Sequence, residues 1–339
     1  MSNRTAYTQS GVDVEAGDRA VELMRARLTA GGGDMYTATA EFAAAVPLPE
    51  NMQQPMMLLA SDGVGTKTEI ARRLGRVDTI GQDLVAMCAD DVLCHGGKAT
   101  YFLDYIALGH IVPERVAEIV GGIGDACDSI GCALVGGETA EHPGLIGDDE
   151  FDLAGFCVGF VERGELVNGR NTQPGDLVIG LASSGLHANG YSLVRKLVDN
   201  GSLPLSDTLL TPSRLYTNDV LELTAEVRRR GFRLAGMAHV TGGGLPGNLP
   251  RALFIGLGVR VEPDSWPQPA IFDQISRAGG IGGREMRATF NCGIGYAVIV
   301  EPAARDVTIG FLGTKGIEAW TIGEVRPLTE LGGERYVEA

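Results

Sequence analysis

Apolar segments that end in glycine-rich polar loops recur along the chain and constrain its fold more than any other feature. The first such junction reads LLASDGVGTKTEIA over residues 58–71, and similar junctions follow at LVGGETAEHPG, LASSGLHANGYSL and HVTGGGLPGNLP. Helix-like segments alternate with these strand-like segments in both halves of the chain. The alternation predicts an α/β (α+β) protein, with ligand-binding groups where the strands end.

A turn-rich segment divides the chain into two expected domains. The segment VERGELVNGRNTQPGDLVIG passes from a charged strand end through polar turn residues to a new apolar strand. A boundary between 168 and 172 gives domains over 1–168 and 169–339, and 339 residues are enough for two hydrophobic cores. In the first domain we expect strands over 56–61, 101–108, 133–136 and 153–161, and helices over 66–74, 79–95 and 113–130. In the second we expect strands over 177–182, 258–262 and 289–300, helices over 189–198 and 212–230, and a closing αβ unit.

Charge and cysteine content exclude several classes of protein. A formal charge of −15 argues against binding to nucleic acid or to an anionic membrane, because both need a basic surface. The six cysteines form no C-x-x-C pair, which is typical of a reduced compartment. No apolar run is long enough to span a membrane, and the N-terminus lacks the pattern of a signal or transit peptide. We therefore expect a cytoplasmic protein, and any phosphorylated ligand must be held by local groups.

The loop after the first strand combines groups that suit a phosphate with its metal ion. Gly63 and Gly65 expose backbone beside the carboxylate of Asp62, and the loop ends in Thr66 and Lys67. The full G-x-x-x-x-G-K-[ST] spacing is missing, so the loop is not a Walker A motif.

The helix expected over 79–95 carries two adjacent aspartates. Helical periodicity places Asp91 on the same stripe as Ile80, Leu84 and Met87, which predicts that its side chain points toward the core. A buried carboxylate is costly unless it is paired, so Asp91 is interpreted as a cation ligand in preference to a buried salt bridge. Asp90 is predicted on a more polar face, where a solvated surface is the simpler interpretation.

Two further acidic segments follow. In YFLDYIAL the period of two places Asp104 on the face of Phe102 and Ile106, where it either contributes to a site or braces a neighbouring backbone. In LVGGETAEHPG an expected strand ends in two glycines, and Glu138, Thr139 and Glu141 follow. A charged surface loop would explain the carboxylates but not the glycine pair.

The second half has two loops of its own. Ser184, His187 and Asn189 lie between an expected strand and helix, where backbone N–H groups can hold an anion, although Ser184 and Asn189 also suit turn and capping roles. Thr241 precedes three successive glycines, and the G-x-G-x-x-G match over 242–247 is followed by Pro250, which would interrupt the helix of a dinucleotide site. We interpret this segment as a phosphate-facing loop.

Together these segments resemble the phosphoribosylformylglycinamidine cyclo-ligase (aminoimidazole ribonucleotide synthetase) family of purine biosynthesis. The resemblance rests on motifs that occur in the family's order from about residue 7 to the C-terminus: YTQSGVDVEAGDRAV, DGVGTK, DTIGQDLVAMCADDVL, FLDY, LVGGETAE, DLAGFCVGFVE, SSGLHANGYSLVRK, HVTGGGLPGNLPR and TFNCGIG. It implies an N-terminal domain that forms a β-barrel with a second copy in a homodimer, and a C-terminal α/β domain with a mixed sheet.

The resemblance also implies ATP, Mg²⁺ and a small ribonucleotide substrate. By motif, the metal ligands would be Asp62, Asp91 and Glu138, and the catalytic residues would be His187, Lys67 and Asn189, with His187 as a general base. The remaining contacts to ATP would come from Gly63, Gly65, Thr66, Gly137, Thr139, Thr241, Gly242 and Gly243. The implied reaction closes formylglycinamidine ribonucleotide to 5-aminoimidazole ribonucleotide. ATP phosphorylates the formyl oxygen, the amidine nitrogen attacks, and ADP and phosphate leave.

Three positions depart from the family pattern. Asp90 stands where the family usually has Asn, His142 stands where it usually has Met, and the glycine-rich loop that closes over ATP is replaced by a different segment over 31–45. Thiamine-monophosphate kinase and selenophosphate synthetase fit the motifs less well. The alternative from another class is a non-catalytic paralogue that binds a nucleotide and acts as a scaffold or regulator.

Overall fold

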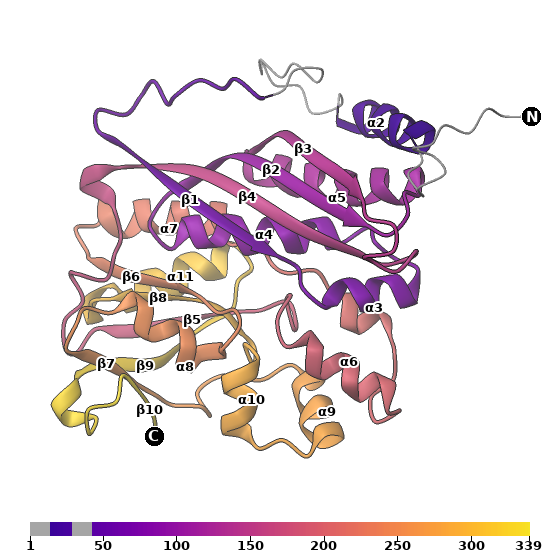
Figure 1. The fold of residues 1–339 in the computed structure, drawn as a ribbon. Coiled ribbons are helices and arrows are strands. Elements are labelled where there is room, and N and C mark those ends of the chain that lie inside the picture. Colours follow the sequence, from indigo (N-terminus) through magenta and orange to yellow (C-terminus); the bar gives the residue numbers. More distant parts are fainter. Residues whose placement is uncertain (1–13, 29–42) are drawn as a thin grey trace, which may run out of the picture.

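The computed structural model describes residues 14–28 and 43–339, which form two β-sheets with helices packed on them (Figure 1). The altered segment over 31–45 lies outside the described residues up to residue 42. Within the described residues, no helix is both long enough and apolar enough to cross a membrane.

The first sheet has four strands in the order β1-β4-β2-β3. Its strands are β1 (Pro55–Gly63), β2 (Lys98–Leu108), β3 (Ala133–Glu141) and β4 (Phe151–Glu162). β4 runs antiparallel to both of its neighbours, and β2 and β3 are parallel. The sheet is open among the strands that the structure describes.

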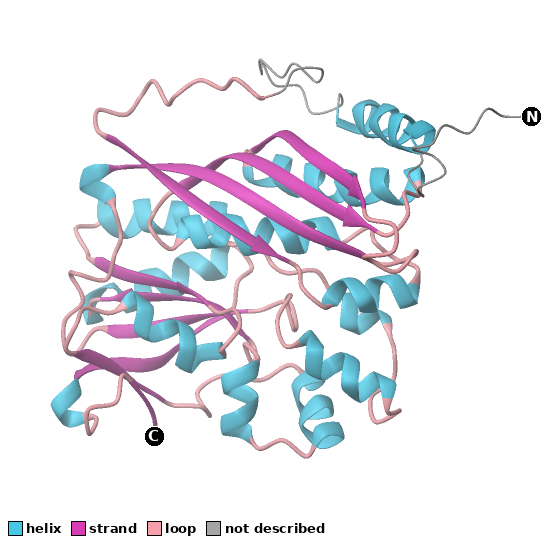
Figure 2. Ribbon diagram, viewed as in Figure 1, coloured by secondary structure: helices cyan, strands magenta, loops and turns pink. Residues whose placement is uncertain are grey.

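Helices cover one face of this sheet. Buried and exposed positions alternate along these strands. The buried positions direct apolar side chains onto α4 (Ile80–Leu93) and α5 (Pro113–Ile130). The helix α2 (Val14–Leu28) packs on α5, and α3 (Lys67–Leu74) follows the glycine loop after β1. The opposite face of the sheet is left uncovered in Figure 2, and it carries the exposed apolar side chains of Met57, Leu59 and Phe156.

The second sheet has six strands in the order β10-β7-β9-β5-β8-β6. The strands are β5 (Leu177–Ala182), β6 (Leu234–His239), β7 (Leu257–Val261), β8 (Ile294–Val300), β9 (Ala319–Pro327) and β10 (Tyr336–Glu338). One face packs on α7 (Thr217–Arg229) and α11 (Arg305–Thr314), and the other on α8 (Gly244–Asn248) and the 3-10 turn η4 (Leu249–Ala252). Contact between α4 and α7 joins the two halves (Figure 1).

A helical corner completes the fold. Helices α6 (Tyr191–Asp199), α9 (Ala270–Gly279) and α10 (Gly283–Thr289) pack together, and α6 also touches α3. Their buried aromatic side chains join the apolar core of the N-terminal half, so this core continues across the junction between the two halves.

The mixed α/β class is confirmed, but several strands differ from the prediction. The strand expected over 289–300 begins only at Ile294, because residues up to Thr289 form α10, and β10 was not predicted. β3 continues through Gly136 and Gly137 to Glu141, so the prediction that this strand ends at the glycines is wrong. Gly137 pairs with Asp104 on β2, and a side chain at residue 137 is excluded because its Cβ would lie 2.2 Å from Oδ1 of Asp104. β6 was not predicted, because its short run LAGMAH lacks a clear alternation of polar and apolar residues.

Candidate active site

The glycine loop after β1 is shaped by close backbone contacts. The N–H of Gly63 donates to Oδ1 of Asp62 at 2.7 Å, and a Cβ on Gly63 would lie 2.8 Å from the carbonyl oxygen of Leu153. Gly65 has a φ of +62°, which favours glycine. Thr66 then occupies the N-cap position of α3, although its side chain makes no capping hydrogen bond. The sequence therefore fixes a tight strand-to-helix turn that holds Asp62 at its start.

Asp62 lies in a cluster with Asp91 of α4 and His239 of β6. Nδ1 of His239 lies 3.0 Å from Oδ1 of Asp91, and the imidazole is buried whereas the Asp91 side chain is 39% exposed. Burial raises the pKa of Asp62, and the negative charge of Asp91 raises it further. Burial opposes protonation of His239, but its hydrogen bond with Asp91 and the surrounding carboxylates outweigh burial and raise its pKa above 6.5.

The Asp62 and Asp91 carboxylates fit a hard divalent cation. The negative charge of Asp91 opposes ionisation of Asp62, which a bound cation would offset, and carboxylate oxygens are the ligands that Mg²⁺ prefers. No set of three or more His, Cys, Asp or Glu side chains converges as a metal cage within the described residues. Mg²⁺ commonly uses one or two carboxylates together with substrate phosphates, so two carboxylates are a sufficient protein contribution.

The predicted orientations of the two adjacent aspartates are reversed. Asp90 is fully buried and accepts hydrogen bonds from the N–H of Tyr216 and, at 2.9 Å, from the hydroxyl of Thr217. The Asp91 side chain is instead 39% exposed. Periodicity failed because α4 has the sheet on one side and α5 and α7 on others, so it has no single core-facing stripe. Asp90 thereby caps the start of α7, while burial raises its pKa to about 6.

Lys67 binds only protein groups in the structure. Its ammonium is completely buried, lies 2.7 Å from Oδ2 of Asp83, and donates to the carbonyl oxygens of His187 and Thr211 at 2.9 Å each. Asp83 also accepts from the N–H and hydroxyl of Ser213. The pair therefore joins α3 and α4 to two segments of the C-terminal half, and all three ammonium donors are used.

Glu138 does not join Asp62 and Asp91 within one chain. It lies on β3, whereas Asp62 lies on β1 at the opposite edge of the same sheet. Three interstrand spacings of about 4.8 Å separate these strands, so the two backbones are roughly 14 Å apart. Thr139 follows Glu138 on the same edge strand. Asp104 lies on the helix-covered face as predicted, and burial raises its pKa to about 7.

His187 is enclosed between the two halves. Its φ is +60°, its Nε2 accepts from the N–H of Ser184 at 3.3 Å, and its Nδ1 is buried with no hydrogen-bond partner among the described residues. Burial lowers its pKa well below 6.5, so the ring is neutral and holds its proton on Nδ1. Because Nε2 already accepts a hydrogen bond, this geometry does not offer a free general base.

The glycine loop after β6 lies beside Asn189. Gly243 and Gly244 have φ values of +87° and +57°, and a Cβ on Gly242 would lie 3.5 Å from Oδ1 of Asn189. Nδ2 of Asn248 donates to the carbonyl oxygens of Gly242 and Gly244 at 3.2 and 2.8 Å. These hydrogen bonds stabilise the positive φ angles of Gly243 and Gly244, which a residue with a β-carbon would disfavour.

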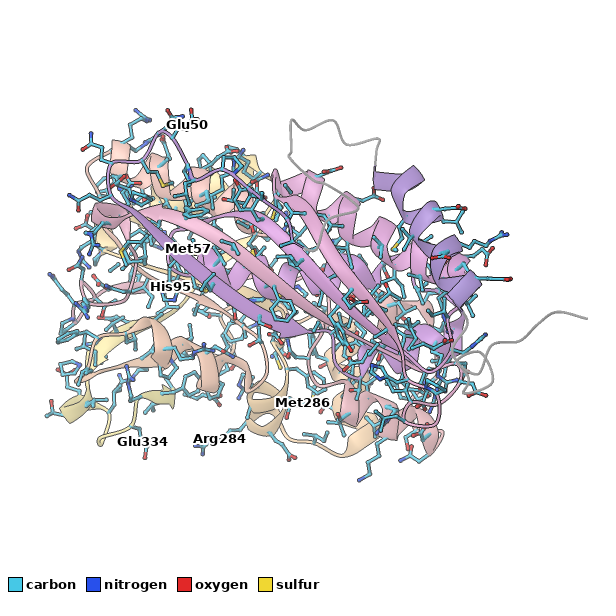
Figure 3. All side chains as sticks on the ribbon, turned by 45° about the horizontal axis from the view of Figure 1, so that its top comes forward. Glu50, Met57, His95, Arg284, Met286 and Glu334 are labelled. Carbon is cyan, nitrogen blue, oxygen red and sulfur yellow. The ribbon has the colours of Figure 1, made fainter. Side chains whose placement is uncertain are left out.

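A cleft of about 660 Å³ lies between the two halves, and of the groups described above Asp91, His239 and Asn248 line it. It is lined by β1 residues 57–61, by the end of α4 with Asp91 and His95, and by β6 with His239. Figure 3 labels Met57 and His95 close together at this side of the molecule. The sequence reasoning missed His239, although an apolar run before it and the glycine loop after it mark the same kind of strand end as the other junctions.

Sequence comparisons assign both halves of the chain. Residues 41–161 match the model of the AIR synthase related protein N-terminal domain, and residues 173–333 match that of the C-terminal domain. Phosphoribosylformylglycinamidine cyclo-ligase of Burkholderia lata is 42% identical over 336 residues, covering 96% of this chain and 94% of that protein. The enzyme of Paraburkholderia xenovorans is 42% identical over 332 residues, covering 95% and 92%.

Solved structures share the fold at low sequence identity. Thiamine-monophosphate kinase from Stenotrophomonas maltophilia aligns with a TM-score of 0.65 at 18% identity, over 94% of this chain and 95% of that one. The hydrogenase maturation protein HypE in complex with ATP aligns with a TM-score of 0.64 at 16% identity, over 92% and 88%. Sequence identity over nearly the whole length settles the family: the chain belongs to the phosphoribosylformylglycinamidine cyclo-ligases.

Proposed function

We propose that this protein catalyses the ATP-dependent closure of formylglycinamidine ribonucleotide to 5-aminoimidazole ribonucleotide, with release of ADP and phosphate. The observation that carries the proposal is the Asp62, Asp91 and His239 cluster at the edge of a cleft between the two halves. The cluster combines carboxylates for a metal with space for a substrate, and 42% identity to named cyclo-ligases selects the reaction.

The chemical difficulty of the reaction is the poor leaving group. Transfer of the γ-phosphoryl group to the formyl oxygen converts that oxygen into a phosphate ester. The amidine nitrogen then attacks the activated carbon, loses a proton, and the carbon–oxygen bond breaks as inorganic phosphate departs. Phosphoryl transfer asks the protein mainly for positioning and charge neutralisation, which suits carboxylates and glycine backbone more than a nucleophilic side chain.

Asp62 and Asp91 would hold Mg²⁺ in this site. The bound ion would neutralise charge on the phosphates. His239 fixes the orientation of Asp91 through its hydrogen bond, and the backbone N–H groups of the loop from Thr241 to Gly243 are available to an anion. Asn189 lies beside that loop and is assigned to substrate positioning.

The proposed roles of Lys67 and His187 change in the light of their geometry. Both are buried at the junction between the halves, and Lys67 holds the backbone of His187 through its carbonyl oxygen. We assign them to positioning the cleft walls, not to direct phosphate binding or proton abstraction. The general base for the amidine is left unassigned.

The uncovered face of the first sheet supports a homodimer. Met57, Leu59 and Phe156 are 53%, 73% and 46% exposed on adjacent strands, and such a patch favours protein contact. Two such sheets packed face to face would form the barrel that the family resemblance implies. Glu138 lies on the edge strand β3, so any contact with an Asp62 and Asp91 cluster would be made in the second copy.

The function is tested by phosphate release from ATP and Mg²⁺, with and without formylglycinamidine ribonucleotide. We expect release that depends on the ribonucleotide and is lost in Asp91→Ala. Asp128→Ala, an exposed aspartate on α5, serves as the matched control and should retain activity. Nucleotide binding without ribonucleotide-dependent release by the folded wild type would contradict the proposal and favour a non-catalytic paralogue.

A further inference from the structure

Arg251 is the one lysine or arginine that lines the cleft in the part of the chain that the structure describes. It belongs to η4, in the C-terminal half of the chain. The chain carries a formal charge of −15, so an anion that enters the cleft meets no general positive field. A local cation therefore matters more here than on a basic protein.

The guanidinium of Arg251 is oriented but not neutralised. One terminal nitrogen donates to Oδ1 of Asn248 at 3.2 Å, and no carboxylate forms an ion pair with it among the described residues. Asn248 is 2% exposed and its own amide group is bound to the glycine loop. A neutral amide acceptor uses one of the five guanidinium N–H donors, which leaves donors available for a ligand.

The other titratable groups on the cleft lining are already bound to protein partners. Asp91 is paired with His239, and His95 is bound through Nδ1 to the carbonyl oxygen of Val167 at 3.0 Å. Arg251 therefore differs from the many paired arginines on the surface in two respects: it faces a cleft, and a buried residue fixes its direction.

We propose that Arg251 binds the phosphate monoester of the phosphoribosyl group of the substrate, an inference that rests on the proposed function. ATP also carries phosphate, but its triphosphate is accompanied by metal ions that carboxylates such as Asp62 and Asp91 can hold. A monoester that arrives without a metal ion needs a cation from the protein. The planar guanidinium can bind two phosphate oxygens at once, which gives the contact direction as well as strength. Asn248 is a positioning residue for this arginine and for the adjacent glycine loop.

Ribose 5-phosphate is the direct probe of this site, with ribose as the uncharged comparison. We expect calorimetric titration to show that Arg251→Ala weakens binding of ribose 5-phosphate by about 10- to 100-fold and leaves ribose unaffected, because a charge-assisted contact is lost. Arg260→Ala on β7, an exposed arginine outside the cleft, is the matched control and should bind as the wild type does. Equal affinity of the folded Arg251→Ala variant and the wild type, or no binding by the wild type, would overturn the proposal.

Steady-state kinetics distinguish the two sources of phosphate. Arg251→Ala should raise the KM for formylglycinamidine ribonucleotide by about 10- to 100-fold while the KM for ATP stays within about twofold. Arg251→Lys keeps the charge but loses the planar fork, so its KM should lie between those of the wild type and Arg251→Ala. A rise in the KM for ATP alone would overturn the assignment. A wild type that binds ribose 5-phosphate through Arg251 yet never turns over the ribonucleotide would refute the proposed reaction and leave the phosphate site standing.

Discussion

Two of the pairs of a basic side chain with a carboxylate that connect the halves of this molecule, Lys67–Asp83 and His239–Asp91, differ in their access to solvent. Lys67 and Asp83 are both 0% exposed, and every donor of the ammonium is bound to protein. His239 is also buried, but its partner Asp91 is 39% exposed and opens onto the cleft. A fully buried pair whose donors all bind protein groups can only stabilise the fold. A pair with one exposed carboxylate can still bind a ligand.

Removing the cation of the dry pair should have the largest effect. Lys67→Met leaves the Asp83 carboxylate buried without its partner and removes the donor to His187 and Thr211. We expect the free energy of unfolding to fall by about 3–5 kcal/mol, measured by urea denaturation. Lys98→Met, at an exposed lysine on β2, is the control.

A double variant sharpens this test. Lys67→Met combined with Asp83→Leu removes both charges and should be more stable than Lys67→Met alone, because no buried charge is left unpaired. A loss below about 1 kcal/mol in the single variant would show that the pair does not fasten the two halves as described.

Asp104 extends the comparison to a buried carboxylate with no cation partner. Burial raises its folded pKa to about 7 from an ordinary value of 3.8, so the folded state binds more protons than the unfolded state between these values. Its contribution to stability is therefore lost as the pH rises from 4 through 7, by roughly 4 kcal/mol for this shift.

Asp104→Asn should remove that dependence on pH. The variant is expected to gain stability relative to the wild type as the pH rises from 4 to 8, measured by thermal and urea unfolding at each pH. Asp125→Asn, at an exposed site on α5, should leave the dependence unchanged. Parallel stability curves for the wild type and Asp104→Asn would show that this carboxyl titrates normally.

The open pair should affect turnover more than stability. Asp91→Asn keeps the shape of the side chain but removes charge from the proposed metal site, so we expect phosphate release to fall by about 100- to 1,000-fold. The free energy of unfolding should change by about 1 kcal/mol or less, because Asp91 is partly exposed. A variant that loses stability and activity in proportion would place Asp91 among the structural residues with Lys67.

The smallest effect is expected at the neighbouring aspartate. Burial raises the pKa of Asp90 to about 6, so below this pH the side chain is largely protonated and resembles asparagine in shape. At pH 5, Asp90→Asn should unfold within about 1 kcal/mol of the wild type, since the amide oxygen can still accept from Tyr216 and Thr217. As the pH rises from 4 to 6 the variant should gain stability relative to the wild type, with little further change above 6. The reverse trend in urea denaturation would disprove the assigned burial penalty.

Much of the local structure follows from sequence because it depends on neighbouring residues. The turn after Asp62 needs Gly63 and Gly65 for reasons of sterics and backbone conformation, and both are visible in the sequence. The alternation in YFLDYIAL likewise places Asp104 on the buried face, which the structure confirms. Family membership was also predicted from the order of the motifs, and 42% identity to named cyclo-ligases confirms it.

The failures concern residues whose surroundings are set by distant segments. Helical periodicity assigned Asp90 and Asp91 to the wrong faces because α4 is surrounded by the sheet and by two helices. The buried contacts of the Lys67 ammonium with residues 83, 187 and 211 were likewise not predicted. No local sequence pattern predicts contacts between residues that lie so far apart in the chain.

The sequence by itself determined the α/β class, the glycine turns and the family, because these depend on local sterics, periodicity and motif order. Only the tertiary structure decided which charged groups are buried and which face the cleft. Access to water depends on how β1, α4, η4 and β6 pack against one another, and that packing separates the buried Lys67 from Asp91 and Arg251. The physical reason is that the cost of burying a charge, and hence its role, is set by all of its neighbours in space.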